Sequence, residues 1–336
     1  MSITLTQLRS FLAVVRTGSV TAAAEELWVT QPSVSAAVSS LAGEVGAALT
    51  ERVGRSIRPT AAGEAFVPYA DDVIGLLERG ERAAREAGEL AARELRLAAV
   101  TTAAEYLVPP LMHAFGERHP DIGLTLDVGN RDHVFRQMLE HRADVAVSGR
   151  PPDGDRLIGD AFGANNRFVL ITSADDPLAN RRSVPLAELA DRFWLLREPG
   201  SGTRMINEQF LARHDVQPRA LTLGSNGAIK QAARAGIGVS LQSRIAVELE
   251  LGSGLLGEIR LRERFPARQW YALRSAVGPV SAAVEAFMEF IDSEGAQRAL
   301  TAWGVSAHSS TTPGRPIGVH LTVSGKKSFP ANFGMS

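Results

Sequence analysis

The sequence predicts an α/β protein in three parts: a small helical unit at the N-terminus, one long helix, and a large region of alternating strands and helices. Capping residues and apolar stripes at helical spacing place three short helices in residues 1–60. Over residues 61–93, apolar residues recur at alternating four- and three-residue spacings, which is typical of a helix that pairs with another helix. From residue 94 to 304, short apolar runs alternate with helical stretches, and this alternation indicates an α/β fold.

Residues 1–60 have the pattern of a winged helix-turn-helix. Thr30 is placed to cap the third helix, and Pro32 lies in its first turn, where a missing N–H costs little. The apolar residues of this helix point inward, which leaves its polar residues free to face a groove of DNA or water. Three arginines then flank Gly54 in the predicted wing, where guanidinium groups can reach phosphates. The predicted DNA-binding residues are Thr30, Gln31, Pro32, Ser33, Ser35, Ser39, Arg52, Arg55 and Arg58.

A polar helix face beside arginines is also typical of a solvated surface, but the order of the residues favours DNA binding. The stretch resembles the LysR-type transcriptional regulators, in which a Thr-Gln-Pro/Ser-x-Val/Leu-Ser helix precedes Leu-x-x-x-x-Gly-x-x-Leu-x-x-Arg and a wing ending in Thr-x-x-Gly. The matching residues are Thr30 to Ser35, then Leu41, Gly46, Leu49 and Arg52, then Thr60 and Gly63. The sequence departs from the family at Ala36, Ala42, Thr50 and Pro59, and Ala36 removes one expected DNA contact.

The resemblance implies a DNA-binding regulator that is not an enzyme. Its expected partners are double-stranded DNA with a roughly palindromic site, a small effector, and RNA polymerase. It is also expected to form a homo-oligomer, either a homodimer or a homotetramer built as a dimer of dimers.

Bulk composition is consistent with such a protein. The formal net charge of −1 means that DNA binding must come from a local patch, which a dimer would double. The absence of cysteine excludes disulfides and cysteine-based zinc sites. No apolar run is long enough to span a bilayer and residues 1–20 lack a signal-peptide layout, so we expect no membrane partner and a cytoplasmic location.

The long helix, residues 61–93, is predicted to be a linker and dimerisation helix. Its seam consists of Phe66, Ala70, Val73, Leu77, Gly80, Ala84, Ala87 and Ala91. Pro68 should bend the start of this helix. A single amphipathic helix packed on its own domain would show a similar pattern, but the family resemblance favours pairing of two subunits.

The region 94–304 resembles the effector domain of the same family, which shares its two-lobed fold with periplasmic solute-binding proteins. Lobe I is placed at 94–163 and 271–304, lobe II at 164–266, and the crossovers near Gly163 and Arg268. Strands are predicted at 95–100, 122–128, 145–147, 168–171, 193–196, 221–223 and 239–241, and helices around 105–118, 132–142, 203–214, 227–235 and 243–250. The alternation predicts open parallel sheets with helices on both faces. Residues 305–336 are expected to be disordered.

Two stretches in these lobes are candidates for binding an anion. Glu198 to Arg204 follows a strand and opens a helix, so that backbone N–H groups, hydroxyls and the helix dipole converge there, and Thr101 with Thr102 holds the equivalent place in lobe I. Either stretch alone is better explained by a plain helix cap, whereas the pair at corresponding positions favours a ligand between the lobes. The predicted ligand-binding residues are Thr101, Thr102, Ser148, Arg150, Ser201, Gly202, Thr203, Arg204 and Asn226.

The Glu-Pro-Gly-Ser-Gly-Thr-Arg stretch looks most like the family branch that regulates carbon-fixation and sulfur-assimilation genes. This resemblance implies a small anionic co-inducer, with no cofactor, no metal and no catalytic residue. The residues alone leave one alternative open, which is an α/β enzyme or small-molecule-binding protein with an appended helical domain.

Overall fold

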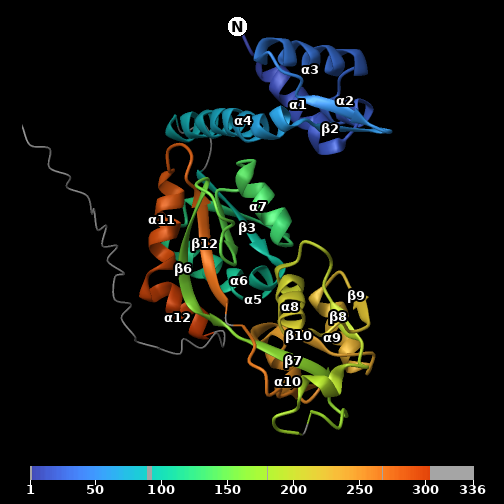
Figure 1. Cartoon of the computed structure of the whole chain (residues 1–336). Coiled ribbons are helices and arrows are strands. Elements are labelled where there is room, and N and C mark those ends of the chain that lie inside the picture. Colours follow the sequence, from blue (N-terminus) through green and yellow to red (C-terminus); the bar gives the residue numbers. More distant parts are fainter. Residues whose placement is uncertain (1, 89–92, 180, 267, 303–336) are drawn as a thin grey trace, which may run out of the picture.

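The computed structural model describes residues 2–88, 93–179, 181–266 and 268–302, and Figure 1 shows their arrangement. The tail predicted to be disordered, 305–336, lies outside the described residues, as does Ala91 of the predicted seam. In the part of the chain that is described, no helix has both the length and the apolar character needed to cross a bilayer.

The N-terminal domain is the predicted winged helix-turn-helix. It contains α1 (Leu5–Thr17), α2 (Val20–Leu27), α3 (Gln31–Val45) and a two-stranded wing of β1 (Thr50–Val53) and β2 (Ser56–Pro59). Thr4 forms the predicted capping box with Gln7, and the Thr30 hydroxyl accepts a hydrogen bond from the N–H of Ser33 at the start of α3. Val34 and Leu41 of α3 are buried, so the polar residues of this helix face outward.

The long helix is α4 (Ala61–Ala87), and it continues through Pro68 without a break. The predicted seam is wrong at its start, because Phe66 and Ala70 pack into the core of the winged helix instead of facing outward. The ring of Phe66 lies 5.8 Å from that of Phe11. The exposed large hydrophobic residues of α4 are Tyr69, Val73 and Leu77.

Lobe I is built on a five-stranded mixed sheet in the order β4-β3-β5-β12-β6. Its strands are β3 (Arg93–Val100), β4 (Ile122–Gly129), β5 (Val145–Ser148), β6 (Leu157–Asn166) and β12 (Arg268–Ser275). One face packs on α5 (Thr101–Tyr106), α6 (Val108–Arg118), α11 (Ala282–Ile291) and α12 (Glu294–Ala302), and the other packs on α7 (Arg131–Leu139). In β3, Leu97 packs toward the first face and Ala98 toward the second, and this burial on both sides explains why the residues from Leu97 to Val100 are all apolar.

Lobe II has two small sheets. Strands β7 (Phe168–Ser173), β10 (Ser240–Ser243) and β11 (Leu256–Ile259) are antiparallel, whereas β8 (Trp194–Leu196) and β9 (Ala220–Thr222) are parallel. The helices are α8 (Gly202–Arg213), α9 (Asn226–Arg234) and α10 (Glu248–Gly252), with 3-10 turns η1 (Leu186–Leu189) and η2 (Arg244–Ala246). The side chains of α8 and α9 fill two separate apolar clusters, and only the cluster of α8 contains buried aromatic residues.

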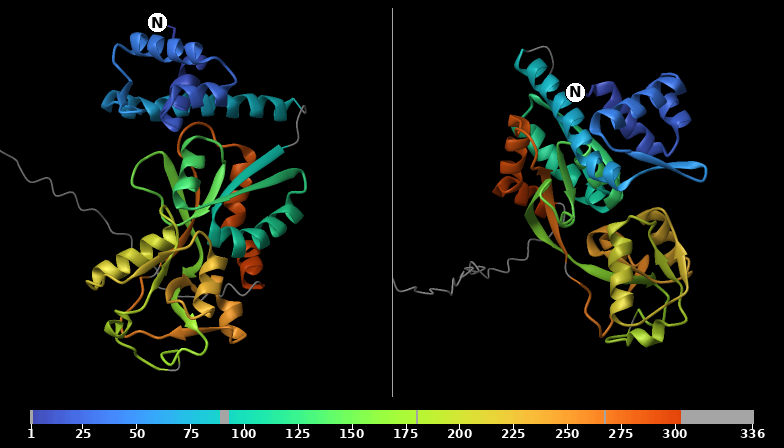
Figure 2. Two further views of the ribbon diagram at one scale, coloured as in Figure 1. Left: turned by 90° about the vertical axis from the view of Figure 1, so that its right-hand side faces the viewer. Right: turned by 45° about the horizontal axis from the view of Figure 1, so that its top comes forward.

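The prediction of purely parallel sheets is wrong. The chain leaves lobe I along β6 and returns along β12, and these two strands run side by side in opposite directions (Figures 1 and 2). Neither strand was predicted, because β6 contains Gly159 and Gly163 and β12 begins and ends with polar residues.

The helix predicted at 105–118 is in fact two helices, since the prolines that follow Leu107 cannot donate the hydrogen bonds that would continue α5.

Figure 2 shows that α4 lies across the end of lobe I and separates that lobe from the rest of the N-terminal domain. Lobe II is at the opposite end of the molecule from the winged helix (Figure 1). Within one subunit, lobe I and α4 therefore connect the region between the lobes to the DNA-binding helices.

Candidate ligand pocket and DNA-facing surface

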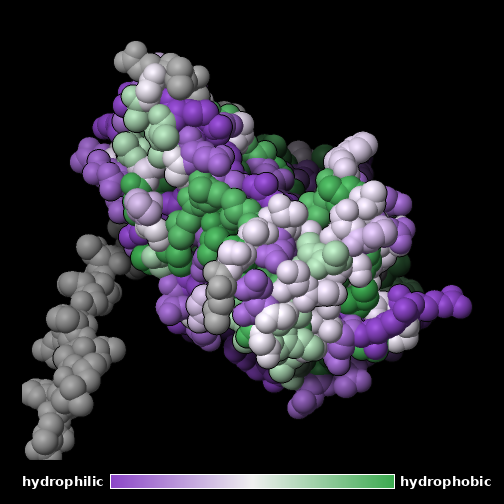
Figure 3. All heavy atoms as spheres, turned by 90° about the horizontal axis from the view of Figure 1, so that it is seen from above, coloured by the Kyte–Doolittle hydropathy of each residue, from purple (hydrophilic) through white to green (hydrophobic). Residues whose placement is uncertain are grey.

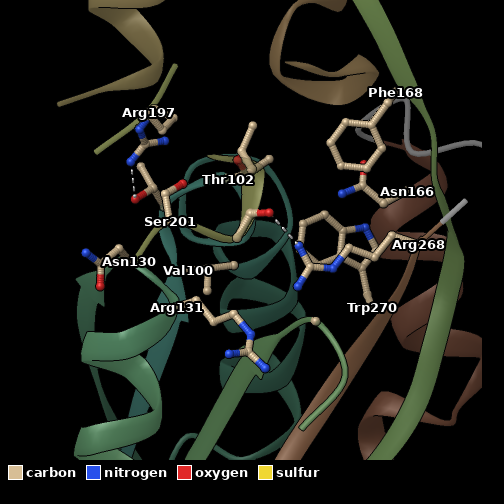
Figure 4. Close-up of a pocket in the computed structure, with 14 residues that line it drawn as sticks. Val100, Thr102, Asn130, Arg131, Asn166, Phe168, Arg197, Ser201, Arg268 and Trp270 are labelled. Carbon is tan, nitrogen blue, oxygen red and sulfur yellow. Dashed lines mark hydrogen bonds between the residues drawn. The ribbon is translucent and has the colours of Figure 1, made fainter. Parts of the chain in front are cut away.

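A small pocket, partly open to solvent, lies between the lobes (Figure 4). The starts of α5, α7 and α8 contribute Thr101, Thr102, Asn130, Arg131, Ser201, Gly202 and Thr203. Strands and strand ends contribute Val100, Gly149, Asn166, Phe168, Arg197, Arg268 and Trp270. The two stretches predicted to meet across the cleft therefore do meet around one cavity.

Arg268 is the cation at the crossover between the lobes. Burial, and then the charge of Arg131, lower the pKa of its guanidinium to about 10. Its Nη1 donates to the carbonyl oxygen of Gly202 at 3.2 Å. A Cβ at Gly149 or Gly202 would meet the guanidinium, so two glycines leave the slot in which this side chain lies. Within the described residues, Arg268 has no carboxylate at ion-pair distance.

Arg131 is the second pocket cation without a carboxylate partner in the described part of the chain. Burial lowers its pKa, although the charge of neighbouring Asp132 acts in the opposite direction. The guanidinium lies 4.2 Å from the centre of the Phe135 ring, which stabilises a cation. Its Nε is buried without a hydrogen-bond partner among the described atoms. Arg131 and Arg268 together make the pocket positive.

Arg197 also lines the pocket, but its charge is already balanced. It is buried, and it donates to both carboxylate oxygens of Glu198 at 2.8 and 2.9 Å and to Oδ1 of Asn226 at 2.5 Å. A weaker contact at 3.4 Å joins it to the hydroxyl of Thr101 in the other lobe. Arg197 therefore links the lobes and orients neighbouring groups.

Four of the predicted ligand residues do not line the pocket. Arg204 turns away, because it pairs with Glu208 on the next turn of α8. Ser148 is buried in β5, and Arg150 is exposed beyond the end of that strand. Asn226 lies behind the pocket, where its amide donates to the Thr102 hydroxyl at 3.3 Å.

Sequence reasoning missed Arg131 and Arg268, although a signal existed for one of them. Asn130 and Arg131 follow β4 directly, so the rule that placed Thr101 at the end of β3 applies equally to them. Arg268 had no such signal, because it starts a strand that returns from the other lobe. Its place in the pocket depends on contacts far apart in the sequence.

The DNA-facing surface has its predicted residues exposed. Those of α3 and its cap all lie on the outer side of the helix, and the three wing arginines have no ion-pair partner within the described residues. Seen from above, the wing projects as a strongly hydrophilic tip (Figure 3). The strand register pairs Arg52 with Ile57 and Arg58 with Glu51, so Arg52 and Arg58 lie on opposite faces of the wing.

Two family models match the chain over both of these regions. Residues 5–64 match "Bacterial regulatory helix-turn-helix protein, lysR family", and residues 88–296 match "LysR substrate binding domain". The chain belongs to the LysR family of transcriptional regulators.

Relatives with curated names and solved structures agree with this assignment. The chain is similar to a RuBisCO operon transcriptional regulator of Allochromatium vinosum, with 38% identity over 88% of this chain and 98% of the relative. It is similar to the regulatory domain of CcmR from Synechocystis PCC6803, solved in complex with 2-PG, at 33% identity and TM-score 0.56 over 59% of this chain and 95% of that domain. Full-length CbnR, solved with its target DNA, shares the fold at 21% identity and TM-score 0.55, over 88% of this chain and 99% of CbnR.

These LysR-family relatives are named as transcriptional regulators and not as enzymes. The alternative of an α/β enzyme with an appended helical domain is therefore set aside. The carbon-fixation branch that the Glu198 to Arg204 stretch suggested is also the branch to which the named relatives belong.

Proposed function

We propose that this LysR-family regulator binds double-stranded DNA through α3 and the wing, and takes a small anion as co-inducer in the pocket between the lobes. The observation that carries the ligand class is the pair Arg131 and Arg268. Two guanidinium groups whose pKa values are lowered by burial face one pocket without a carboxylate in the described residues. A bound phosphate, sulfate or carboxylate would neutralise them through charge-assisted hydrogen bonds.

The relatives support an anion that carries phosphate or carboxylate. The CcmR domain was solved with 2-PG, 2-phosphoglycolate, which carries both groups. We infer that the ligand of this chain belongs to the same chemical class, and the proposal requires no further cofactor. Thr101, Thr102, Ser201, Gly202 and Thr203 would supply hydroxyl and backbone donors around the anion.

The anion would also hold the lobes together. The N-termini of α5 and α8 face the same pocket with like partial charges, and a bound anion converts this repulsion into attraction. The contacts of Arg197 with Thr101 and of Asn226 with Thr102 already join the lobes at this place. A ligand that prefers the joined arrangement would stabilise it by the difference in its affinity for the two states.

The proposal also covers the organisation of the molecule. We assign residues 1–60 to DNA binding, 61–93 to the linker helix, and 94–304 to effector binding in two lobes. Pairing through α4 would make a homodimer, and two dimers would make the homotetramer, which acts on promoter DNA with RNA polymerase in the cytoplasm.

The ligand site is tested by titration calorimetry of the full chain with 2-phosphoglycolate, with orthophosphate and sulfate as simpler probes. We expect Arg268→Met to weaken binding by about ten- to a hundredfold, because it removes a charged hydrogen-bond donor. Arg150→Met is the matched control, since it removes an exposed arginine outside the pocket and should leave the affinity unchanged. Equal losses in both variants, or a pocket that accepts only neutral ligands, would contradict the proposed site.

A further inference from the structure

Trp28, in the turn between α2 and α3, is the most exposed large apolar side chain of the described residues. It is 94% exposed, and Val29 beside it is 47% exposed. The indole N–H donates no hydrogen bond within the described part of the chain. A side chain that normally buries a large apolar area in a folded protein therefore contacts almost nothing in its own chain.

The backbone of Trp28 has a left-handed conformation, which is unusual for a tryptophan. All three helices of the N-terminal domain end in a left-handed residue, with φ 68° at Gly18, 56° at Trp28 and 79° at Gly46. Glycine adopts this conformation without cost, whereas a residue with a Cβ, and above all a bulky one, does not. The chain thus has tryptophan where its own two equivalent positions have glycine.

The turn holds Trp28 firmly by its backbone. The N–H of Trp28 donates to the carbonyl oxygen of Glu25 at 3.2 Å, and the N–H of Val29 donates to that of Ala24 at 3.0 Å. These bonds close the helix end without any help from the indole. The side chain is therefore presented to the outside by a fixed backbone, and its removal should not open the turn.

The position of the turn indicates what the indole meets. Trp28 lies two residues before Thr30, which caps α3. The first residues of a recognition helix are those that approach base edges in the major groove. A side chain fixed just before this helix lies at the border of the groove, where the sugar-phosphate backbone runs. An indole suits that border, because its flat face packs on deoxyribose and its N–H donates to a phosphate oxygen.

We propose that Trp28 is a DNA contact that positions α3 on the backbone at the edge of the major groove. The inference rests on the proposed function, namely that α3 binds DNA. It adds a residue outside the polar set of α3 and the wing, and it assigns that residue to the sugar-phosphate backbone and not to base recognition.

The test uses the full chain and a duplex selected in vitro for binding to the parent protein. We expect Trp28→Gly to bind this duplex about tenfold more weakly, as for the loss of one hydrogen bond to a charged group. The same variant should unfold at an equal or higher temperature than the parent, because glycine relieves the left-handed conformation. A purely structural tryptophan would instead lower the unfolding temperature.

Quenching of tryptophan fluorescence by acrylamide provides the second measurement, best made in a Trp303→Phe background. Trp194 and Trp270 are buried, at 0% and 5% exposure, so Trp28 should supply the readily quenched component. DNA should protect that component, and the component should be missing from Trp28→Phe. Full affinity of Trp28→Gly, or a component that DNA leaves unprotected, would overturn the inference. If the parent binds no duplex at all, the proposed function itself fails.

Discussion

At the scale of the residue, arginine supplies the positive charge of both proposed binding surfaces. Of the 36 basic Lys and Arg side chains, only Lys230, Lys326 and Lys327 are lysines. The planar guanidinium group donates two parallel hydrogen bonds to a carboxylate or phosphate, whereas an ammonium group acts as a compact charge. The important distinction is therefore between arginines with a carboxylate partner, such as Arg204, and those with none in the described residues, such as Arg268, which donates only to a carbonyl oxygen.

Gln31 and Arg55 should contribute to DNA binding in different ways. Gln31 begins α3 and is exposed, so its amide can read a base edge, whereas Arg55 lies at the tip of the wing, where we expect its guanidinium to contact phosphates. We expect Gln31→Ala to relax base preference by roughly 1–3 kcal/mol and Arg55→Ala to weaken binding to all sequences alike. Competition binding with single-base variants of the selected duplex separates the two effects, and unchanged preference in Gln31→Ala would contradict the recognition-helix assignment.

At the scale of the element, α4 is fastened to lobe I of its own chain by polar contacts. Asp72 pairs with Arg156 at 2.5 Å and with His141 at 2.8 Å, and Arg82 pairs with Asp144 at 2.6 Å. His141 is buried against α4, and this burial lowers its pKa despite the carboxylate of Asp72. These contacts join the helix that carries the DNA-binding domain to the lobe that forms one side of the pocket.

Neutral substitutions of the neighbouring residues Asp71 and Asp72 should change the unfolding temperature in opposite directions. Burial, and then the nearby carboxylate of Glu140, raise the pKa of Asp71 from 3.8 to about 6. A carboxyl group that holds its proton more tightly when folded adds stability below pH 3.8, and this contribution is lost as the pH rises through about 6. We therefore expect Asp71→Asn to raise the unfolding temperature at pH 8, and the gain to shrink as the pH falls below 6.

Asp72→Asn is the matched control for this prediction, because it removes the partner of Arg156 and His141. It should lower the unfolding temperature at pH 8, since breaking a largely buried pair leaves an uncompensated charge. Thermal unfolding of both variants and the parent between pH 5 and pH 8 makes the comparison. If the two variants shift the unfolding temperature in the same direction, the proposed role of burial at Asp71 is wrong.

At the scale of the whole molecule, α4 leaves an apolar stripe that lobe I and the winged helix do not cover. Tyr69, Val73 and Leu77 are 69%, 49% and 39% exposed and follow one another at four-residue spacing. Residues at this spacing share one face of a helix, so they present a continuous surface for a second copy of α4. Phe66 and Ala70 pack into the core of the winged helix instead, so the expected contact is made by the middle of α4, with Tyr69 beside the predicted seam residues Val73 and Leu77.

Leu77→Glu should therefore break the dimer. It places a carboxylate in the proposed seam, where an unpaired charge is costly to bury. Sedimentation of the variant beside the parent, without ligand or DNA, should show a smaller assembly for the variant. Leu249→Glu is a suitable control, because Leu249 is 81% exposed in lobe II, far from α4. If parent and Leu77→Glu sediment alike, the stripe does not hold the assembly together.

The sequence by itself determined the features that depend on short stretches of chain. The caps at Thr4 and Thr30, the apolar runs of strands such as β3 and β7, and the family resemblance were all predictable, because neighbouring residues produce them. The two helix starts around the pocket were predictable for the same reason, since the ends of strands in an α/β sheet lie at one edge.

Only the tertiary structure decided which of these residues have partners. Arg204 is paired within its own helix, whereas Arg268 reaches Gly202 across 66 positions of sequence and Arg197 reaches Asn226 across 29. Strands β6 and β12 likewise form through their pairing with each other, since neither has a strong apolar pattern in its own sequence. Local periodicity reports which side of an element is buried, but the charge left over in a pocket depends on contacts that the fold makes between distant parts of the chain.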